Sequence, residues 1–507
     1  MSSHLVRVLV RRTVALSSSV VLALPVLLGA GGLAPLRAQL VTPKTVPVHN
    51  AQQFDVFPSA NAAMGGVSIA LDDSLLDAFV NPAKGARIRQ GRFFTTPFSH
   101  SVSNARGGGR TLPIGGNVPV GPWTFSGVFA IQQLDRSGPM RWTNVISDRS
   151  AMNQYVTTAV SRRLREGLSI GLTSSWGDLG AVDGVDLMYA TSDRITQSGD
   201  FSDLRVGLLK EWNDSRSFEL LVLHNRFAMT HDVHYRTWRW DTGGRVPISV
   251  ERTDRNDDRS EVWGAHARYV APYGTEGWRF GWIGTVNKLW HPKIPTYVLE
   301  GSFPIPRDPG HTTGFNLGVG IGRTRGGTTF GADFILEPIR TETWADAAKD
   351  TSVAGGPVIR SGAKTMENSF RFSNVRMRLG LSHDVAADSS AGRIFGFQLG
   401  LDVYSINYRL GQTDNVRKTF RTQREGWVEW GPAFGFRYQA RQFRAQYTFT
   451  WTCSATSCIG AGDRVMVTSP SLLEAASAPV VFAPTAALTF DGGTVKTHRI
   501  SVSVPIR

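Results

Sequence analysis

The sequence holds few residue patterns that could carry out chemistry. Gly167-Leu168-Ser169-Ile170-Gly171 matches the G-x-S-x-G pattern, in which a serine nucleophile occupies a sharp strand-to-helix turn. Here, however, Leu168, Ile170 and Leu172 continue an alternating pattern that is typical of a strand. The motif therefore predicts an ordinary strand, and we expect no catalytic residue and no enzyme activity.

Two further patterns resemble ligand sites. His231-Asp232-Val233-His234 offers two imidazoles, but it lies in a predicted surface hairpin with no further metal ligand close in the sequence. Gly318, Gly320 and Gly322 recur at every second residue, which is the period of a strand face and not of a phosphate-binding loop. We expect no metal site and no cofactor.

The two cysteines, Cys453 and Cys458, are five positions apart in a loop-like stretch rich in Ser and Thr. In an exported protein such a pair predicts a small disulfide ring. The alternative, a metal site, would need further ligands nearby, and the sequence offers none.

The first 38 residues are predicted to be a secretory signal peptide. Three arginines precede an apolar run from Val14 to Leu28, and Ala38 is a small residue suited to cleavage. The alternative, a membrane anchor, is disfavoured because Pro25 and a glycine cluster interrupt the run before the ~20 residues that a spanning helix needs.

The chain is basic, with a formal net charge of +14, of which the predicted signal peptide carries four arginines and no acid. A basic balance can indicate nucleic-acid binding. Export and the scattered placement of the arginines argue against that interpretation, so we expect the anionic headgroups of outer-membrane lipid or a polar cargo as partners, and no nucleic acid.

Alternation of apolar and polar residues is the strongest signal in the chain. Phe315, Leu317 and Val319 alternate with glycines and Asn316, and the stretch 441–451 is equally regular. About fifteen segments follow this rule, each near the ~9 to 11 residues of a tilted membrane strand. They are 92–102, 123–131, 155–164, 168–176, 204–212, 218–229, 263–270, 278–290, 315–322, 328–336, 374–382, 395–408, 428–438, 441–451 and 500–506.

Two features favour a membrane barrel over a soluble sandwich. Aromatic residues such as Trp123, Trp212 and Trp451 stand at strand ends, as in the girdles at membrane interfaces. The polar faces carry glycine with charged and amide residues, which predicts a wet lumen. Arg376 and Arg378 must point inward, because an arginine facing mid-bilayer lipid costs roughly 2 to 4 kcal/mol.

The stretches between these strands are predicted to be loops. Residues 253–260 are highly charged, residues 341–365 are polar, and residues 453–493 are long and rich in Ser, Ala and Pro. Asp241-Thr242-Gly243-Gly244 predicts the turn of a hairpin above the membrane. Short turns alternating with long excursions match a barrel with tight periplasmic turns.

The stretch from Ala63 to Ala86 is of a different kind. Asp72 or Asp73 is predicted to cap a short helix through Ser74 to Val80, and Asn81-Pro82 ends it. Its apolar residues need a place to be buried, and the barrel interior or its periplasmic mouth is the available one.

The run from Asn61 to Gly91, NAAMGGVSIALDDSLLDAFVNPAKGARIRQG, resembles the N-terminal signature of FadL-type outer-membrane transporters and their PorV-like relatives. The resemblance implies a hatch folded inside a barrel of fourteen strands, with hydrophobic ligands bound beside it. By position, Gly65 and Gly66 would form the tight start of the hatch, and Asn81, Pro82 and Ala83 its turn.

We therefore predict an all-β, transmembrane antiparallel β-barrel of about fourteen strands with an N-terminal hatch. Residues 1–38 would be the signal peptide, 39–90 the hatch and 91–507 the barrel. The predicted lumen lining is Arg268, Asp333, Arg376, Arg378, Asp402, Glu429 and Arg444. These charges either pair into a network beside the hatch, which intramembrane charges normally do, or bind a ligand directly.

The predicted function is passive transport of a small hydrophobic or amphipathic compound across the outer membrane. The alternative implied by the PorV-like resemblance is a scaffold for protein secretion, whose partners would be other envelope proteins. An outer-membrane hydrolase would need a Ser or His constellation, which the sequence does not offer.

Overall fold

The computed structural model describes residues 52–102, 108–135, 150–182, 194–240, 243–244, 246–274, 276–290, 294–296, 310–347, 350–352, 358–388, 392–454 and 494–506. The predicted signal peptide and the first residues of the predicted hatch, 39–51, lie outside these ranges. Within them, no helix combines the length and apolar character needed to cross a membrane.

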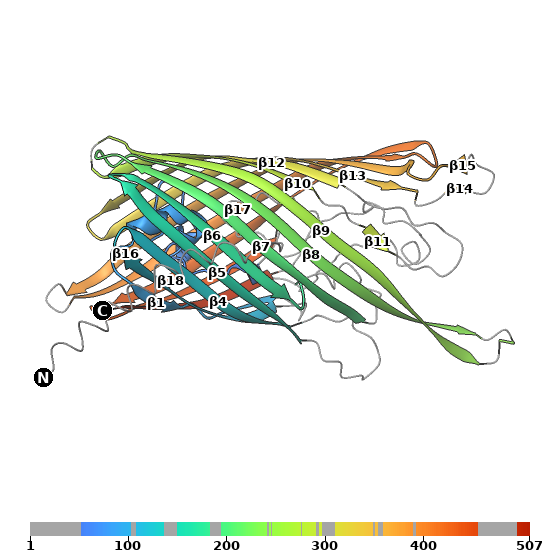
Figure 1. Ribbon diagram of the computed structural model, residues 1–507, viewed down its shortest axis with the longest axis horizontal. Helices are drawn as coiled ribbons and strands as arrows, with labels where there is room; N and C mark the ends of the chain where they lie inside the picture. Colours follow the sequence, from blue (N-terminus) through green and yellow to red (C-terminus); the bar gives the residue numbers. More distant parts are fainter. Residues whose placement is uncertain are drawn as a thin grey trace, which may run out of the picture.

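The described chain forms a closed antiparallel β-barrel of sixteen strands (Figure 1). Its sheet has 18 strand segments, but β1 and β2 pair with the same two neighbours, and β10 and β11 pair with successive stretches of β9. The segments are β1 (Arg92–Thr95), β2 (Phe98–Val102), β3 (Gly108–Val120), β4 (Trp123–Asp135), β5 (Ser150–Arg165), β6 (Leu168–Leu179), β7 (Arg194–Glu211), β8 (Ser217–Trp240), β9 (Pro247–Pro272), β10 (Trp278–Trp290), β11 (Ile294–Thr296), β12 (Gly310–Arg325), β13 (Thr328–Asp346), β16 (Lys364–Asp388), β17 (Arg393–Asp414), β18 (Thr419–Gln439), β19 (Arg444–Ser454) and β20 (Thr494–Pro505). A separate small hairpin pairs β14 (Thr351–Ser352) with β15 (Val358–Ile359).

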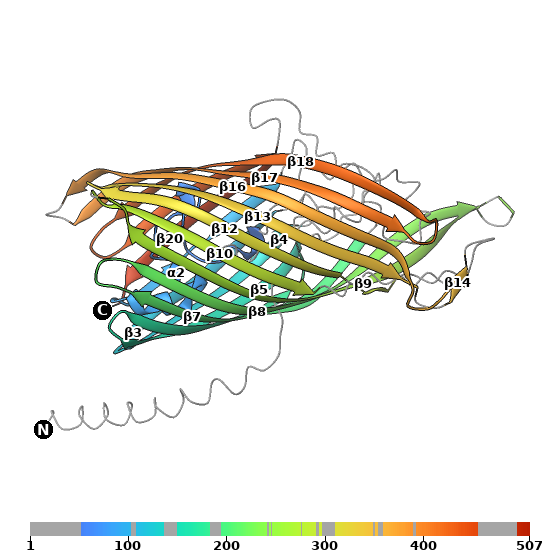
Figure 2. The same cartoon turned by 90° about the horizontal axis from the view of Figure 1, so that it is seen from above.

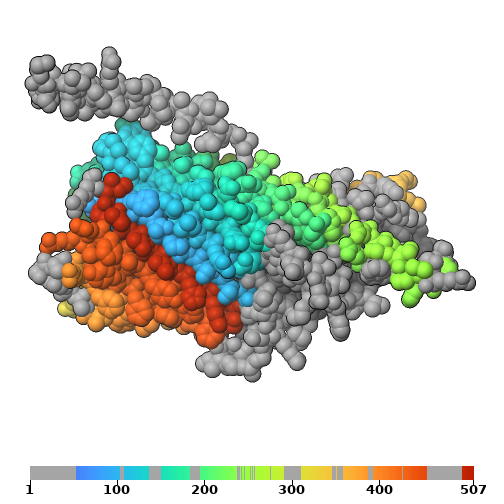
Figure 3. All heavy atoms as spheres, turned by 90° about the horizontal axis from the view of Figure 1, so that it is seen from below, coloured from blue at the N-terminus to red at the C-terminus, as the bar shows by residue number. Residues whose placement is uncertain are grey.

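The barrel closes where its last strand meets its first. β20 pairs with β19 on one side and with β1 and β2 on the other. Figure 3 shows this strand, in red, lying between the blue N-terminal strands and the orange ones. Closure removes the free edges of the sheet, so every strand has two partners, as membrane insertion requires.

The predicted number of fourteen strands is wrong. Alternation located fifteen of the sixteen strands, and the remaining one, β3, was not recognised. Its sequence contains Pro113 and Pro119, which cannot donate backbone hydrogen bonds and normally demote a segment from a sheet. The outward residues Leu112, Ile114 and Val118 nevertheless alternate with buried positions. Fourteen was also the number implied by the family resemblance, which this chain exceeds.

Apolar side chains face outward along the barrel, as the alternation predicted. Phe315, Leu317 and Val319 are each 44 to 53% exposed on β12, whereas the intervening Gly318 and Gly320 are buried. Buried polar residues such as Gln132 and Asn153 face the interior. This arrangement suits a lipid exterior and a polar interior.

The two ends of the barrel differ in their connections. At the end that holds the C-terminal residues, neighbouring strands join through short turns such as Gly121-Pro122 and Gly326-Gly327. At the other end, β8 and β9 continue as a hairpin well beyond the barrel (Figures 1 and 2). This confirms the predicted hairpin around residues 241–244.

One predicted loop is wrong, and a second is wrong in part. Residues 253–260 belong to β9 and pair with β8, and residues 341–346 belong to β13. Outside the bilayer, neither face of a strand contacts hydrocarbon. A strand can therefore continue there without the alternation of apolar and polar residues by which it is recognised in the sequence. Ion pairs such as Arg255–Asp232, at 2.8 Å, stabilise this part of the hairpin.

Residues 52–91, called here the N-terminal segment, are enclosed by the strands (Figures 1 and 2). The segment contains the 3-10 helices η1 (Gln52–Phe54), η2 (Ala62–Met64) and η3 (Pro82–Arg87) and the α-helix α2 (Asp77–Val80). The helix is shorter than the predicted Ser74 to Val80. Asp73 still caps the turn before it, since its carboxylate accepts hydrogen bonds from the amides of Leu75 and Leu76, both at 3.1 Å.

Candidate functional site

Sharp local turns fold the N-terminal segment into a compact body. Gly65 and Gly66 follow η2 with φ of 67° and 73°, a left-handed conformation that glycine adopts without strain. The carbonyl of Asn61 accepts hydrogen bonds from the amides of Met64 and Gly66, which closes the turn. Gly65 also has no room for a side chain, because a Cβ would lie 2.8 Å from the carbonyl oxygen of Leu401.

The second turn is built by Asn81, Pro82 and Ala83. The Asn81 side chain caps η3 by accepting a hydrogen bond from the Ala83 amide at 3.1 Å, and Pro82 follows at a position that suits its missing N–H. The Asn81 amide group also donates to Glu219 on β8 at 3.3 Å. The turn is thus fixed to the barrel wall by a polar contact.

Inward-facing glycines of the wall make room for the segment. A Cβ on Gly320 would lie 2.6 Å from Cβ of Ile69, and one on Gly171 would lie 2.6 Å from the Ala83 nitrogen. The other wall glycines where a Cβ would overlap the segment are Gly207, Gly281, Gly318, Gly322, Gly331, Gly380, Gly400 and Gly435. The prediction that these glycine faces border a wet lumen is therefore wrong, because the segment packs directly against them.

Aromatic and aliphatic packing joins the first part of the segment to β1 and to strands β4 to β8. Phe57 stacks on Phe79 within the segment, with ring centroids 4.9 Å apart. Phe54 meets Tyr155 and Phe201 of the wall edge to face, at 6.2 and 6.1 Å. These contacts bury the apolar residues for which the sequence predicted a place in the barrel interior.

A buried ionic cluster fixes the middle of the segment to β8, β9 and β10. The cluster comprises Asp72, Asp77, Lys84 and Arg87 of the segment with Glu219, Arg268 and Arg279 of the wall. Lys84 lies 3.0 Å from Asp77 and 3.1 Å from Glu219. Arg268 pairs with Glu219 and Asp72 and donates to the carbonyls of Ile69, at 2.9 Å, and Leu71, at 3.2 Å.

The two carboxylates of the segment respond to this cluster in opposite directions. Burial raises the pKa of Asp77 to about 6, although Lys84 acts to lower it. Burial also acts to raise the pKa of Asp72, but Lys84, Arg268 and Arg87 hold it well below its usual range. Asp72 is therefore the main anionic partner of the surrounding cations.

The remaining wall contacts are made mainly to backbone groups of the segment. Asp333 accepts hydrogen bonds from the amides of Ser68, at 2.8 Å, and Ile69, at 3.3 Å. Arg378 donates to the carbonyl of Gly66 at 3.2 Å. Arg499 donates to the carbonyls of Asp55 and Phe57, at 2.9 and 3.2 Å.

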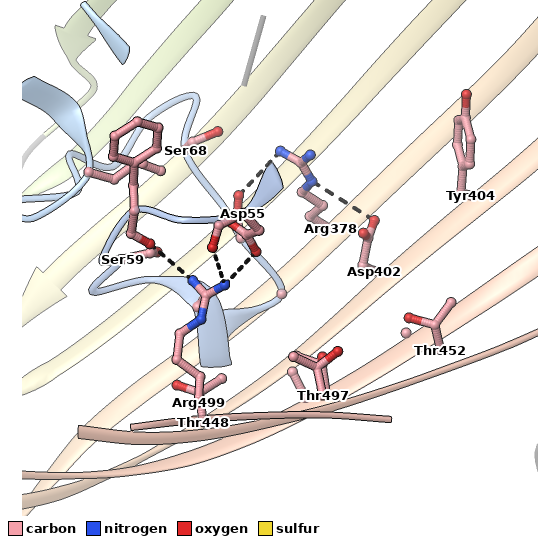
Figure 4. Close-up of a pocket in the computed structure, with 18 of the residues that line it drawn as sticks. Asp55, Ser59, Ser68, Arg378, Asp402, Tyr404, Thr448, Thr452, Thr497 and Arg499 are labelled. Atoms are coloured by element: carbon pink, nitrogen blue, oxygen red, sulfur yellow. Dashed lines mark hydrogen bonds and ion pairs between the residues drawn. The ribbon is translucent and has the colours of Figure 1, made fainter. Parts of the chain in front are cut away.

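A cavity of about 180 Å³ lies between the segment and strands β16 to β20 (Figure 4). One side is apolar and comes from the segment, chiefly Phe54, Phe57, Leu76, Phe79 and Val80. The other side is polar and comes from the wall, with Tyr404, Thr448, Thr450, Thr452 and Thr497. The charged lining residues are Asp55, Arg376, Arg378, Asp402, Glu429 and Arg499.

The predicted lumen residues divide into two groups. Arg376, Arg378, Asp402 and Glu429 line the cavity, and Arg268 and Asp333 hold the segment instead. Arg444 is partly buried at the start of β19, and within the described part of the chain its Nε has no hydrogen-bond partner. Cys458 lies outside the described residues, so the predicted disulfide with Cys453 stays a prediction.

The patterns first considered for chemistry occupy ordinary strand positions. Ser169 is buried within β6, away from any strand-to-helix turn. His231 is buried in β8 and not solvated as a surface hairpin residue would be. The described residues contain no group of three or more His, Cys, Asp or Glu side chains arranged to hold a metal ion.

Five residues of the site were not predicted from the sequence: Asp72, Asp77, Lys84 and Arg87 of the segment, and their partner Glu219 on β8. The available signal was four charges within a stretch otherwise suited to burial, because buried charges require partners. Thr497 was missed as well, since a single threonine on a strand face carries no distinguishing pattern.

The chain matches known proteins in structure but not in sequence. No protein-family model matches the chain, and no curated protein matches it in sequence. A FadL homologue of Pseudomonas aeruginosa is 10% identical with a TM-score of 0.42, over 89% of this chain and 99% of that one. The toluene transporter TbuX of Ralstonia pickettii is 11% identical with a TM-score of 0.37, over 90% of this chain and 100% of that one.

The ferric-catecholate import receptor Fiu of E. coli is 9% identical with a TM-score of 0.36, over 82% of this chain and 81% of that one. At these TM-scores the structural similarity gives no information about the cargo of this chain. The FadL homologue and TbuX are thus among the solved structures to which this chain is similar.

Proposed function

We propose that the protein is a passive outer-membrane transporter of small hydrophobic or amphipathic compounds, with the N-terminal segment as its hatch. The observation that carries the proposal is the cavity between the segment and β16 to β20, which has one apolar and one polar side. Ligand sites of this kind are mostly apolar with a few placed polar groups. No cofactor is needed for passive transport.

The way in which the segment is held supports a hatch that can rearrange. Its contacts with the wall are noncovalent, and many are hydrogen bonds from wall side chains to backbone carbonyls, such as those of Gly66 and Phe57. Such bonds can be exchanged for water or for a cargo group at modest net cost, about 0.5 to 1.5 kcal/mol each. The scaffold alternative has no comparable observation in its favour among the described residues.

The proposal is tested by flux into proteoliposomes. The purified protein should accelerate uptake of small apolar probes above the rate of protein-free liposomes. Uptake of a large hydrophilic dye should not change, because the segment occupies the interior. If no apolar probe enters faster than it enters protein-free liposomes, the transport function is refuted.

A reversible crosslink tests whether the segment is the hatch. A Cβ on Gly85 would lie 3.3 Å from Cβ of Ser161 on β5, close to the ~3.5 to 4.5 Å that a disulfide spans. The double variant Gly85→Cys/Ser161→Cys should lose flux when oxidised and regain it on mild reduction. Each single-cysteine variant is the matched control, and full flux through the oxidised double variant would exclude a moving hatch.

A further inference from the structure

Most charges around the cavity lie close to a charge of opposite sign. Arg376 donates to Asp402 at 2.8 Å, and Nε of Arg378 lies 3.9 Å from the same carboxylate. Arg499 lies 2.7 Å from Asp55. With Glu429, the described lining carries three cations and three anions, so it has no net charge that would attract an anionic cargo.

The polar wall is a row of hydroxyl groups. Thr448, Thr450 and Thr452 occupy alternate positions of β19, and Thr497 stands opposite Thr450 on β20. Thr497 is 5% exposed, and its Oγ1 is buried without a hydrogen-bond partner among the residues that the structure describes. A buried hydroxyl without a partner costs about 1 to 3 kcal/mol, and a cargo hydroxyl would remove that cost.

The apolar wall and the volume limit the cargo to about one ring. Phe57 and Phe79 form a stacked pair beside Phe54 and Leu76, and all four line the cavity. Its volume is about 180 Å³, and an engineered apolar cavity of about 150 Å³ in another protein binds benzene. One six-membered ring with one or two substituents therefore fits.

We propose that the cavity binds uncharged single-ring compounds that carry a hydroxyl group, with the ring against Phe57 and Phe79 and the hydroxyl against Thr497. This inference rests on the proposed transport function and specifies its cargo class. The lining disfavours organic acids of the same size, because Arg376 and Arg499 are each already paired with a carboxylate. The hydroxyl row favours a phenol or cyclic alcohol over a bare hydrocarbon.

Three probes of matched shape test the proposal: p-cresol, toluene and 4-methylbenzoate. Binding is measured by calorimetry with the protein in lipid nanodiscs, and empty nanodiscs correct for partition into lipid. One added hydrogen bond predicts that p-cresol binds about 3- to 10-fold more tightly than toluene. The benzoate should bind most weakly of the three.

A pair of isosteric variants assigns the preference to the site. Thr497→Val should bring p-cresol binding down to the level of toluene and leave toluene binding unchanged. Thr173→Val is the matched control, because Thr173 is also buried, its Oγ1 also lacks a partner, and it does not line the cavity. The control should retain the preference for p-cresol.

The outcomes separate this inference from the proposed function. If toluene binds as tightly as p-cresol, or Thr497→Val leaves the preference intact, the hydroxyl site is overturned while the transport function stands. If 4-methylbenzoate binds best, the argument from paired charges is wrong. If none of the probes binds and none enters proteoliposomes, the transport function falls together with its cargo class.

Discussion

Replacing Arg268 by methionine should release the N-terminal segment from the wall while leaving the barrel closed. Arg268 is 4% exposed and connects Asp72 and the carbonyls of Ile69 and Leu71 to Glu219 on the neighbouring strand. Methionine keeps a similar apolar stem but removes every one of these polar contacts. The strand pairing of β9 does not depend on the guanidinium group.

The magnitude follows from the partners left behind. Breaking a buried ion pair costs about 3 to 5 kcal/mol, because one charge remains buried without a partner. Lys84 stays 3.1 Å from Glu219 and 3.6 Å from Asp72, so we take the lower end, about 3 kcal/mol. That value corresponds to a roughly 100-fold larger population of the undocked segment.

Hydrogen exchange measures this population directly. The amides of Ser68 and Ile69 donate to Asp333 only while the segment is docked, so their exchange should accelerate about 100-fold in Arg268→Met. Arg376→Met is the matched control, since Arg376 pairs with Asp402 on the wall and donates no hydrogen bond to the segment among the contacts described. Unchanged protection in Arg268→Met, or equal loss in the control, would refute the assignment of Arg268 as the principal tether.

Three further changes test other parts of the site. Because docking raises the pKa of Asp77 to about 6, the protonated carboxyl group stabilises the docked segment. This stabilisation is complete below about pH 4 and is lost as the pH rises through 6. Between pH 4 and 7 the unmodified protein should lose on the order of 3 kcal/mol of docking free energy, measured by hydrogen exchange. Asp77→Asn cannot lose a proton, so its docking free energy should not decline over this range. Gly171→Ala should push the turn at Ala83 away from the wall and lower the free energy of unfolding by about 1 to 3 kcal/mol, measured by thermal denaturation. Gly284→Ala should leave this free energy unchanged, because an added Cβ would meet no described atom within 4 Å. Phe57→Ala should widen the cavity at a cost of about 3 to 5 kcal/mol, seen as a lower melting temperature together with uptake of larger apolar probes.

The barrel could be predicted from the sequence because lipid imposes a strict chemical pattern. An outward position must be apolar, so Phe315, Leu317 and Val319 reveal their strand without any tertiary information. The same constraint is absent beyond the bilayer, which is why the charged end of β9 was assigned to a loop. It is also weakened by proline, which concealed β3.

The partners of the buried charges could not be predicted in the same way. Alternation determines which face of a strand a residue occupies, but it does not determine the register in which two strands pair. Glu219 and Arg268 become neighbours because β8 and β9 pair continuously over their full length. That register brings Glu219 and Arg268 together within reach of Lys84 and Asp72. Lys84 and Asp72 belong to a segment without any periodic pattern.

The inward glycines show how a pattern can be identified correctly and explained wrongly. Their period of two was recognised as a strand face, and the faces that carry them together with polar residues were interpreted as the lining of a wet lumen. Water, however, tolerates polar side chains of any size, so a lumen filled with water gives no reason to select glycine on one face of strands such as β12. A backbone that packs against the wall does give such a reason, since a Cβ on Gly320 would overlap Ile69 and one on Gly171 would overlap Ala83. Glycines on the inner faces of several strands, together with an apolar N-terminal stretch, therefore predict both that the stretch is docked inside the barrel and which strands it contacts.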